Sequence, residues 1–504
     1  MKFNQVSKGK NQVVNYENAP AYRLTPEWDL YASVVTTSLS DKFYEPATGR
    51  VEKIRDLIQK NDPQFVARLA VYAREKMNLR SIPLVLAVEL SKIHSGDALL
   101  SRLTARIVQR ADEITELLAY YQLSGKREGV KKLNRLSKQL QAGLQQAFNK
   151  FDEYQFAKYN REAEIKLRDA LFLVHPKAKN EAQQLIFNKI VDDSLQTPYT
   201  WETELSALGQ TRFESQEAKK AAFTQKWEEL IDSGKVGYMA LLRNLRNILE
   251  AEVSLSHIER VCNTLSAKEK VLQSKQLPFR FLAAYRELMS VHSGHTVKVM
   301  NALEEAVKAS AENINGFDES TKVLVACDVS GSMYKTISPK SKVKNFDIGL
   351  MLGMLLKSRC KNVVTGIFGT EWKIVNLPDS GVLSNVEEFY KREGEVGYAT
   401  NGYLVVEDLI NRKKAVDKIM MFTDCQLWNS FGDAHLKDVW KKYKTIAPEA
   451  KMYLFDLAGY GRVPLEITDD NVYLIAGWSD KIFDIMAAID NGSDALKEIN
   501  AIEI

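Results

Sequence analysis

The chain has 504 residues, too many for a single hydrophobic core, so its length predicts two or more domains. Hydrophobic residues make up 45% and charged residues 27%, as in ordinary soluble globular proteins, and no apolar run is long enough to cross a bilayer. This composition excludes a disordered chain and a membrane-spanning protein, and we expect no membrane partner. The net charge of +4 is uneven: residues 316–504 hold 23 Lys and Arg against 27 Asp and Glu, and residues 1–315 hold the remaining 46 against 38.

The start of the chain and its cysteines indicate a cytoplasmic protein. Residues 1–10 are polar and basic and lack the apolar core of a signal peptide. The four cysteines fall at no metal-ligand spacing. Cys327 and Cys425 lie in or beside predicted strands, where a reduced thiol packs as a small apolar group.

Most of the first 310 residues carry helical periodicity. Residues 1–50 predict an arm followed by a short helix. From Val51 onward apolar residues recur at helical spacing, and Asp62-Pro63 pairs an N-cap with proline at the first helical position. Helical units of this length, joined by short polar turns, are typical of a HEAT-like solenoid.

A group of basic residues lies within this helical region. Spacings of three and four residues would place several of them on one helix face, a geometry suited to a phosphate backbone. An ordinary solvated lysine-rich face explains the same pattern, and the two interpretations stay open. The group consists of Lys126, Arg127, Lys131, Lys132, Arg135 and Lys138.

The pattern changes at residues 313–318, a turn-rich linker. Beyond it we predict strands at 322–328, 362–368, 371–376, 418–423, 451–456 and 471–475, with helices between most of them. Alternating strands and helices are typical of a doubly wound α/β sheet with a parallel core. We therefore predict a helical-repeat domain over residues 1–315 and an α/β domain over residues 316–504.

The stretch Lys322–Met333 carries the clearest chemical signal. An apolar run that reads as a buried strand stops at Asp328, and Ser330 and Ser332 follow around Gly331. Carboxylate and hydroxyl oxygens at the carboxyl end of a parallel strand suit Mg²⁺, with Mn²⁺ as an alternative. A polar turn whose hydroxyls cap the next helix would explain the same residues.

Two later segments add to this site. The apolar run from Lys418 stops at Asp424, and parallel strand ends meet at one edge of a sheet. Between the two strands, the glycine-bounded loop 397–402 offers Thr400. We expect the metal to lie at the solvent edge of the sheet and, being incompletely neutralised, to accept an acidic ligand from a partner protein.

The sequence favours binding over catalysis. No histidine falls between His295 and His435, and phosphate-binding, nucleophile-elbow and zinc-protease motifs are absent from the sequence. We therefore predict a protein that is not an enzyme, with a metal-assisted hydrolase as a remote alternative.

The pattern Asp328-x-Ser330-x-Ser332 resembles the metal-ion-dependent adhesion site of von Willebrand factor A domains, and Thr400 and Asp424 match its second and third elements. An A domain after a long helical-repeat region resembles the Ro ribonucleoprotein (TROVE-domain) family, in its bacterial type. The stretches that carry this resemblance are Phe65–Arg74, Met239–Leu245, Gln276–Leu282 and Thr423-Asp424.

The resemblance implies a ring of helical repeats that touches the A domain. It also implies two RNA ligands, small noncoding Y RNA on the outer surface and single-stranded 3′ ends of misfolded RNA in the cavity, with an exoribonuclease as a partner. Lys158 and His175 match an RNA-contacting lysine and histidine of the family. The family's arginine one turn after the lysine falls on Glu162, with Arg161 beside it. His175, just before Pro176, is also explained as a helix C-terminal residue.

We therefore expect a non-catalytic RNA-binding scaffold that acts in RNA quality control or maturation. The alternative from another class is a metal-dependent protein-interaction scaffold without RNA binding. A contiguous basic surface that includes Lys158 and residues 126–138 would distinguish the first from the second.

Overall fold

The computed structural model describes residues 12–36, 47–125, 136–160, 163–274, 276, 278–311, 317, 319–337, 341–357, 360–376, 378, 381–392, 394–428, 435–467, 471–477, 482–490 and 493–504. The chain forms two compact units. Unit 1 contains residues 1–48 and 204–495, and unit 2 contains residues 49–203 and 496–504.

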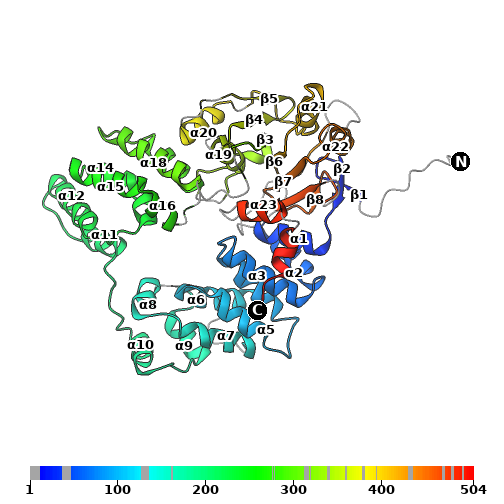
Figure 1. The fold of residues 1–504 in the computed structure, drawn as a ribbon. Coiled ribbons are helices and arrows are strands. Elements are labelled where there is room, and N and C mark those ends of the chain that lie inside the picture. The colour runs from blue at the N-terminus through cyan, green and yellow to red at the C-terminus, as the bar shows by residue number, and fades with distance from the viewer. Residues whose placement is uncertain are drawn as a thin grey trace. The chain divides into compact units, whose positions relative to one another are not determined.

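Unit 2 is built from short helices that pack on their sequence neighbours, as α3 does on α4 and α5 (Figure 1). The N-terminus of α3 confirms the predicted signal, because the Asp62 side chain accepts the Phe65 N–H and Pro63 opens the helix. The elements are α2 (Ala47–Gln59), α3 (Pro63–Glu75), α4 (Ser81–Leu90), α5 (Leu99–Ile107), α6 (Ala111–Ser124), α7 (Lys138–Phe148), α8 (Glu153–Tyr159), α9 (Leu167–Val174), α10 (Glu181–Val191) and α24 (Ala495–Asn500).

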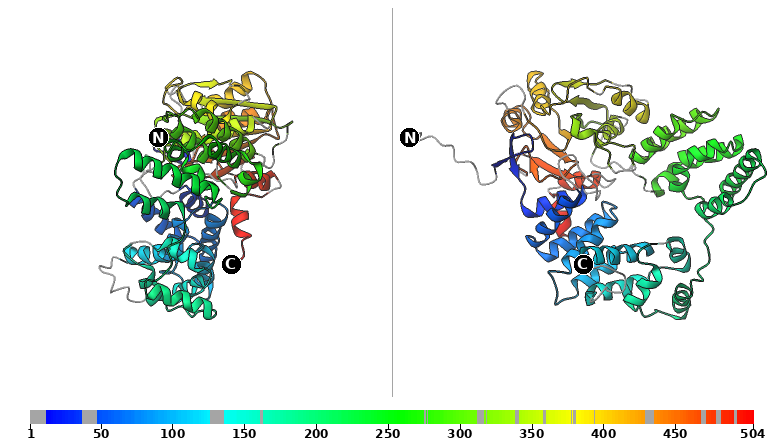
Figure 2. Two further views of the ribbon diagram at one scale, coloured as in Figure 1. Left: turned by 90° about the vertical axis from the view of Figure 1, so that its left-hand side faces the viewer. Right: turned by 180° about the vertical axis from the view of Figure 1, so that it is seen from behind.

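The helical part of unit 1 runs from α11 to α18. Helix α15 packs on α12 and on α18, and these helices lie side by side in every view (Figures 1 and 2). Residues 238–250 form two helices, α13 and α14, because the chain breaks at Asn244. The elements are α11 (Trp201–Gly209), α12 (Gln216–Asp232), α13 (Tyr238–Arg243), α14 (Leu245–Glu250), α15 (Leu255–Ser266), α16 (Lys268–Ser274), α17 (Pro278–Leu288) and α18 (Thr296–Ser310).

The second part of unit 1 is a six-stranded sheet in the order β5-β4-β3-β6-β7-β9. Strand β5 is antiparallel to β4, and all the other pairs are parallel. The strands are β3 (Lys322–Asp328), β4 (Asn362–Phe368), β5 (Trp372–Ile374), β6 (Lys418–Thr423), β7 (Lys451–Asp456) and β9 (Val472–Ala476), all within two residues of their predicted ends. The connecting elements are the 3₁₀ helix η3 (Gly331–Tyr334), α19 (Asn345–Lys357), α20 (Val382–Tyr390), α21 (Tyr403–Asn411), α22 (Leu436–Lys444) and α23 (Ile482–Asp490).

The strand order places a topological switch point between β3 and β6. The chain leaves β3 toward β4 and β5, and it then returns to β6 on the other side of β3. Ligands of open α/β sheets bind beyond the carboxyl ends of the strands at such a point. Helix α19 packs closely on β6. A Cβ atom at Gly349 of this helix would lie only 2.7 Å from the Phe422 ring, so the position requires glycine.

The N-terminal residues differ from the expected arm. Strands β1 (Gln12–Val14) and β2 (Pro20–Arg23) form a hairpin, and β2 pairs with β8 (Arg462–Val463) in a second sheet. These strands have two to four residues each, too few for an alternating apolar pattern to stand out. Helix α1 (Pro26–Val35) matches the expected short helix and contacts β9.

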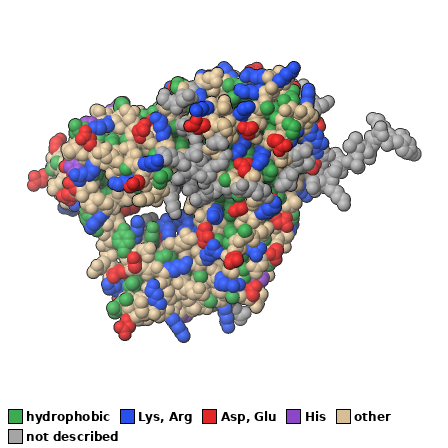
Figure 3. Space-filling view, viewed as in Figure 1, with side chains coloured by type: hydrophobic (Ala, Val, Ile, Leu, Met, Phe, Trp, Pro, Cys, Tyr) green, Lys and Arg blue, Asp and Glu red, His purple; other side chains and the backbone are tan. Residues whose placement is uncertain are grey.

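Other properties of the described residues agree with the composition. All four cysteines are free and buried. No helix in the described ranges is both long enough and apolar enough to span a membrane. On the face shown in Figure 3, basic and acidic side chains are interspersed over each unit. The predicted boundary at residue 315 stays a prediction.

Candidate functional site

Asp328 ends β3 at the switch point and is fully buried. Its Oδ1 accepts the Ser330 N–H at 2.8 Å, and its Oδ2 accepts the Thr423 hydroxyl, from the end of β6, at 2.7 Å. The Ser330 and Ser332 hydroxyls lie 3.3 Å apart in the turn that follows. Asp328 was expected at a solvent edge, but the adjacent strand and the turn enclose it.

Asp424 follows β6, the neighbouring strand, and is 2% exposed. Its Oδ1 accepts the Gln426 N–H at 3.1 Å, and its buried Oδ2 has no hydrogen-bond partner among the described residues. Cys425, between Asp424 and Gln426, has a φ of 61°, a left-handed backbone conformation that residues other than glycine rarely adopt. The loop therefore takes a strained path immediately after the carboxylate.

Thr400 joins the same group from the loop before α21. Its hydroxyl donates to the Gln426 carbonyl oxygen at 2.9 Å, and its own carbonyl oxygen accepts the Trp428 N–H at 3.2 Å. These two bonds tie loop 397–402 to the residues that follow Asp424. The structure therefore brings together all five residues predicted for the metal site.

The electrostatics of this group favour a bound cation. Burial raises the pKa of Asp328 above its ordinary range, although the Ser330 and Thr423 hydrogen bonds oppose the shift. Burial, together with the charge of Asp328, also raises the pKa of Asp424. Two buried carboxylates that repel each other, one with an unpartnered oxygen, fit a divalent cation that would compensate both charges.

The oxygen donors of this group suit a hard cation. Within the described residues, no cluster of three or more His, Cys, Asp or Glu side chains is arranged to hold a metal ion. The group combines two carboxylates with three hydroxyls, and hard oxygen donors of this kind suit Mg²⁺ or Mn²⁺.

Asp456 belongs to the same edge and was not singled out from the sequence. It ends β7, is fully buried, and its Oδ1 accepts the N–H groups of Ala458 at 2.9 Å and Gly459 at 2.7 Å. Its charge contributes to the raised pKa of Asp424. The signal was present, because the apolar run 451–456 stops at a carboxylate as the two earlier strands do.

The predicted RNA-binding residues are described only in part. Lys126, Arg127, Lys131, Lys132, Arg135, Arg161 and Glu162 lie outside the described residues. Lys138 is exposed at the start of α7. His175 is exposed and takes a left-handed conformation (φ 50°, ψ 55°) at the end of α9, so the structure gives it a place at the helix C-terminus.

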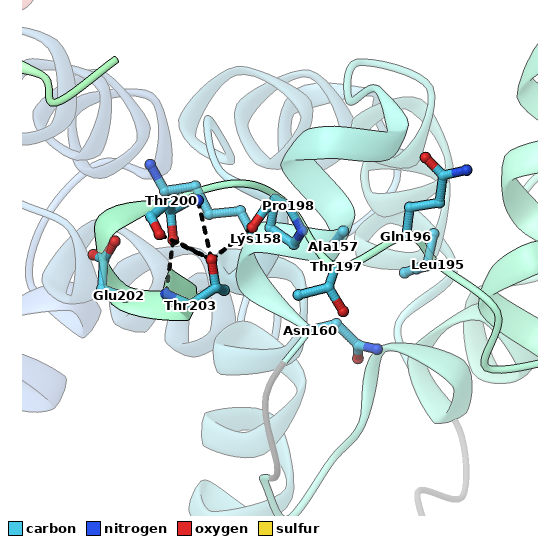
Figure 4. Close-up of a pocket in the computed structure, with 10 residues that line it drawn as sticks. All are labelled: Ala157, Lys158, Asn160, Leu195, Gln196, Thr197, Pro198, Thr200, Glu202 and Thr203. Atoms are coloured by element: carbon cyan, nitrogen blue, oxygen red, sulfur yellow. Dashed lines mark hydrogen bonds between the residues drawn. The ribbon is translucent and has the colours of Figure 1, made fainter. Parts of the chain in front are cut away.

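Lys158 lines a pocket of about 330 Å³ within unit 2 (Figure 4). Its amino group lies 5.8 Å from the centres of the Tyr154 and Tyr159 rings. The opposite wall is segment 195–203, in which Thr203 donates its hydroxyl to the Pro198 carbonyl oxygen at 2.7 Å. The described lining of this pocket thus contains one cation, Lys158, and no aromatic ring.

A larger cleft of about 590 Å³ lies within unit 1, lined by α13, α14, α17 and residues 341–342. Of its four cationic side chains, Arg246 and Lys342 pair with Glu287. Arg243 and Arg280 have no acidic partner among the described residues. Partial burial of the Arg280 guanidinium in the cleft, together with the charge of Arg243, lowers the pKa of Arg280, although part of this side chain is exposed to solvent. Two neighbouring cations without a counterion attract an anionic ligand.

Comparisons with known proteins agree with this architecture. The family model described as the TROVE domain matches residues 32–222 and 193–314, together more than half of the chain. The crystal structure of the Deinococcus radiodurans RO (RSR) protein superimposes with a TM-score of 0.61 at 16% identity, over 93% of this chain and 100% of that one.

Two curated relatives share sequence with part of the chain. Telomerase protein component 1 of Rattus norvegicus is 25% identical over 338 residues, which cover 51% of this chain and 12% of that protein. Its counterpart in Mus musculus is 26% identical over 303 residues, which cover 44% and 11%. The matched part is thus a small fraction of these relatives. From the family match over more than half of its length, with which the shared fold agrees, the chain belongs to the TROVE-domain family.

Proposed function

We propose that this protein is a non-catalytic RNA-binding scaffold of a ribonucleoprotein that works in RNA quality control or maturation. Its RNA ligands would be a small structured Y-type RNA and the single-stranded 3′ ends of misfolded RNA, and an exoribonuclease would act beside it. The helical regions would form a HEAT-like ring around the RNA, next to a von Willebrand A-type domain, in the cytoplasm.

The observation that carries the RNA-binding role is the pair Arg243 and Arg280. The two side chains share one cleft, the charge of one lowers the pKa of the other, and neither has an acidic partner in the described part of the chain. Phosphate groups would supply the missing negative charge, and arginine offers them a planar, bidentate donor. A single strand fits this cleft, since its flexible backbone can follow a concave surface.

The test is a salt titration of RNA binding. Replacing Arg243 and Arg280 together by Gln should weaken binding of single-stranded RNA of any sequence. It should also reduce the salt dependence, by roughly 0.7 logarithmic units per lost phosphate contact for a tenfold change in salt. Arg412→Gln is the matched control, because Arg412 is exposed and paired with Asp408 at 2.8 Å. An unchanged salt slope in the double variant would remove this cleft from the RNA-binding surface.

The metal site supports a second role beside RNA binding. We propose that Mg²⁺, or Mn²⁺ in its place, is held by Asp328, Ser330, Ser332, Thr400 and Asp424. The cation would supply an electrophilic position for a carboxylate from a partner protein, since neutral hydroxyls leave part of its charge uncompensated. The unpartnered Oδ2 of Asp424 supports this assignment. Calorimetric titration with Mg²⁺ tests it, and no binding by the wild-type chain would contradict it.

The alternative function, a protein-interaction scaffold without RNA binding, depends on the same metal site. A scaffold that binds only a protein through this site would retain Mg²⁺ and bind no RNA. Crosslinking in cells followed by sequencing of the bound RNA distinguishes the two functions.

A further inference from the structure

The hairpin β1–β2 contacts the loop that carries Asp424, more than 400 residues away in the sequence. Asn15 is 2% exposed, and its Nδ2 donates to the Leu427 carbonyl oxygen at 2.7 Å. The Tyr16 N–H donates to Oε1 of Gln426 at 2.8 Å. One turn of the hairpin thus bonds two successive residues of the loop.

Asn15 also shapes the turn from which these bonds come. Its Oδ1 accepts the N–H groups of Glu17 and Ala19, both at 2.9 Å. The two ends of one amide therefore have separate tasks: the oxygen closes the turn, and the nitrogen bonds the loop after β6.

Gln426 connects the hairpin to the proposed metal ligands. Its N–H donates to Oδ1 of Asp424, and its carbonyl oxygen accepts the Thr400 hydroxyl. Gln426 is 1% exposed, and Cys425 before it takes the left-handed conformation described above. Such a conformation persists when surrounding contacts hold the backbone, and the hairpin supplies two such contacts, to Gln426 and Leu427.

The hairpin is itself anchored on the loop that follows β7. Strand β2 pairs with β8, the Tyr16 ring packs edge-to-face on Tyr460, and the Arg462 guanidinium lies 4.7 Å from the Tyr16 ring centre. The N-terminal segment therefore spans the loops after β6 and β7. Asp424 directly follows β6, and Asp456 ends β7.

We propose that this hairpin is a positioning element of the metal site, in which Asn15 and Gln426 hold residues 424–428 in the conformation that lets Asp424 and Thr400 share one cation. The inference rests on the metal site proposed above. Residues that orient metal ligands without touching the ion typically change metal affinity by about 10–100-fold when they are replaced.

The test uses the full chain, Mn²⁺ as the probe, and substitutions at three positions, Asn15, Asn18 and Asp424. Asn15→Asp keeps the oxygen that closes the turn but loses the donor to Leu427. Asn18→Gly is the control in the same turn, since Asn18 has a φ of 59° that glycine adopts freely. Asp424→Asn removes a proposed ligand. Mn²⁺ affinity is measured by electron paramagnetic resonance, and hydrogen exchange of the Gln426 and Trp428 amides is followed without metal.

We expect Asn15→Asp to lower Mn²⁺ affinity about tenfold or more and to speed exchange of both amides. Saturating Mn²⁺ should restore slow exchange, because the ligands themselves remain. Asn18→Gly should match the wild type in both measurements, and Asp424→Asn should abolish binding.

Wild-type affinity and exchange in Asn15→Asp and also in Asn15→Ala, beside lost binding in Asp424→Asn, would overturn the inference and leave the metal site standing. A wild-type chain that binds no Mn²⁺ would overturn the metal site, and the inference with it.

Discussion

At the scale of single residues, Asp328 is held in an environment that disfavours its own charge. It is fully buried beside Asp424, and burial raises its pKa. A carboxylate whose pKa is raised in the folded protein costs stability when it is ionised, and a bound cation reverses that cost. The ionised Asp328 carboxylate should therefore lower the stability of the metal-free protein and raise its affinity for a metal ion.

We expect Asp328→Asn to abolish Mg²⁺ binding and to raise the unfolding temperature of the metal-free protein at neutral pH. The amide keeps an acceptor for the Ser330 N–H but removes one of two repelling charges. Calorimetric titration and thermal unfolding in chelator check the two effects. A metal-free unfolding temperature below that of the wild type would mean that the Asp328 carboxylate stabilises the fold by itself.

Metal binding should release protons and weaken as the solution is acidified. With raised pKa values, Asp328 and Asp424 bind more protons near neutrality in the metal-free folded protein than carboxyls of ordinary pKa, about 3.9, would. The cation must displace these protons, so affinity should fall between about pH 8 and about pH 6. Titrations in two buffers of different ionisation enthalpy measure the released protons. Binding without proton release would mean that both groups are already ionised before the metal arrives.

At the scale of secondary-structure elements, α17 and α19 are joined by an ion pair within unit 1. Arg286 donates from Nη1 and Nη2 to the two carboxylate oxygens of Asp347, at 2.6 and 2.9 Å. Asp347 is fully buried and Arg286 is 10% exposed. Arg286 also donates to the Lys342 carbonyl oxygen at 3.0 Å, so the pair holds the segment that leads into α19.

Replacing Arg286 by Leu should lower the free energy of unfolding by about 3–5 kcal/mol, because Asp347 and Glu387, both of which pair with Arg286, would remain largely buried without this partner. Arg246→Leu is the control, since the exposed pair of Arg246 with Glu287 should contribute no more than about 1 kcal/mol. Denaturant titrations of the two variants check the difference. Equal losses would mean that the pair is no stronger than a surface contact.

The backbone conformation at the end of α9 provides a test of the role of His175. Its left-handed conformation suits asparagine better than alanine. If the imidazole contacts RNA, His175→Asn and His175→Ala should both weaken binding of a structured RNA more than binding of a simple 3′ overhang. Parallel binding assays with the two RNAs check this. Equal losses on both RNAs would assign His175 to the turn before Pro176 alone.

At the scale of the whole molecule, the proposed metal ligands and the Arg243–Arg280 cleft are made of different elements. The ligands lie at or after the ends of β3 and β6 or precede α21, and the arginines lie in α13 and α17. Because the two sites share no residue, a chelator should leave RNA binding in place. Binding assays with and without chelator check this. The variant with Lys131, Arg135 and Lys138 changed to Gln is the reference for lost RNA binding, because its RNA affinity and its salt dependence should both be lower. If chelation releases the RNA while the protein stays folded, the two sites are coupled.

The sequence alone determined the secondary-structure pattern and most of the candidate site. Strands β3, β6 and β7 lie where apolar runs were read, because a buried parallel strand needs an uninterrupted apolar segment. Asp328 and Asp424 were singled out because parallel strands bring their carboxyl ends to one edge, a rule that needs only chain order. The family resemblance rested likewise on local stretches, and the family match confirmed it.

Only the tertiary structure decided which distant residues complete and support this site. The hairpin around Asn15, the left-handed Cys425 and the Arg286–Asp347 pair have no periodicity or spacing that announces them. The full burial of Asp328 is also a property of its neighbours, since β6 and the turn after β3 enclose it. Local patterns report how a segment folds on its own neighbours, whereas burial, strain and hydrogen bonds across hundreds of residues arise only when the segments pack together.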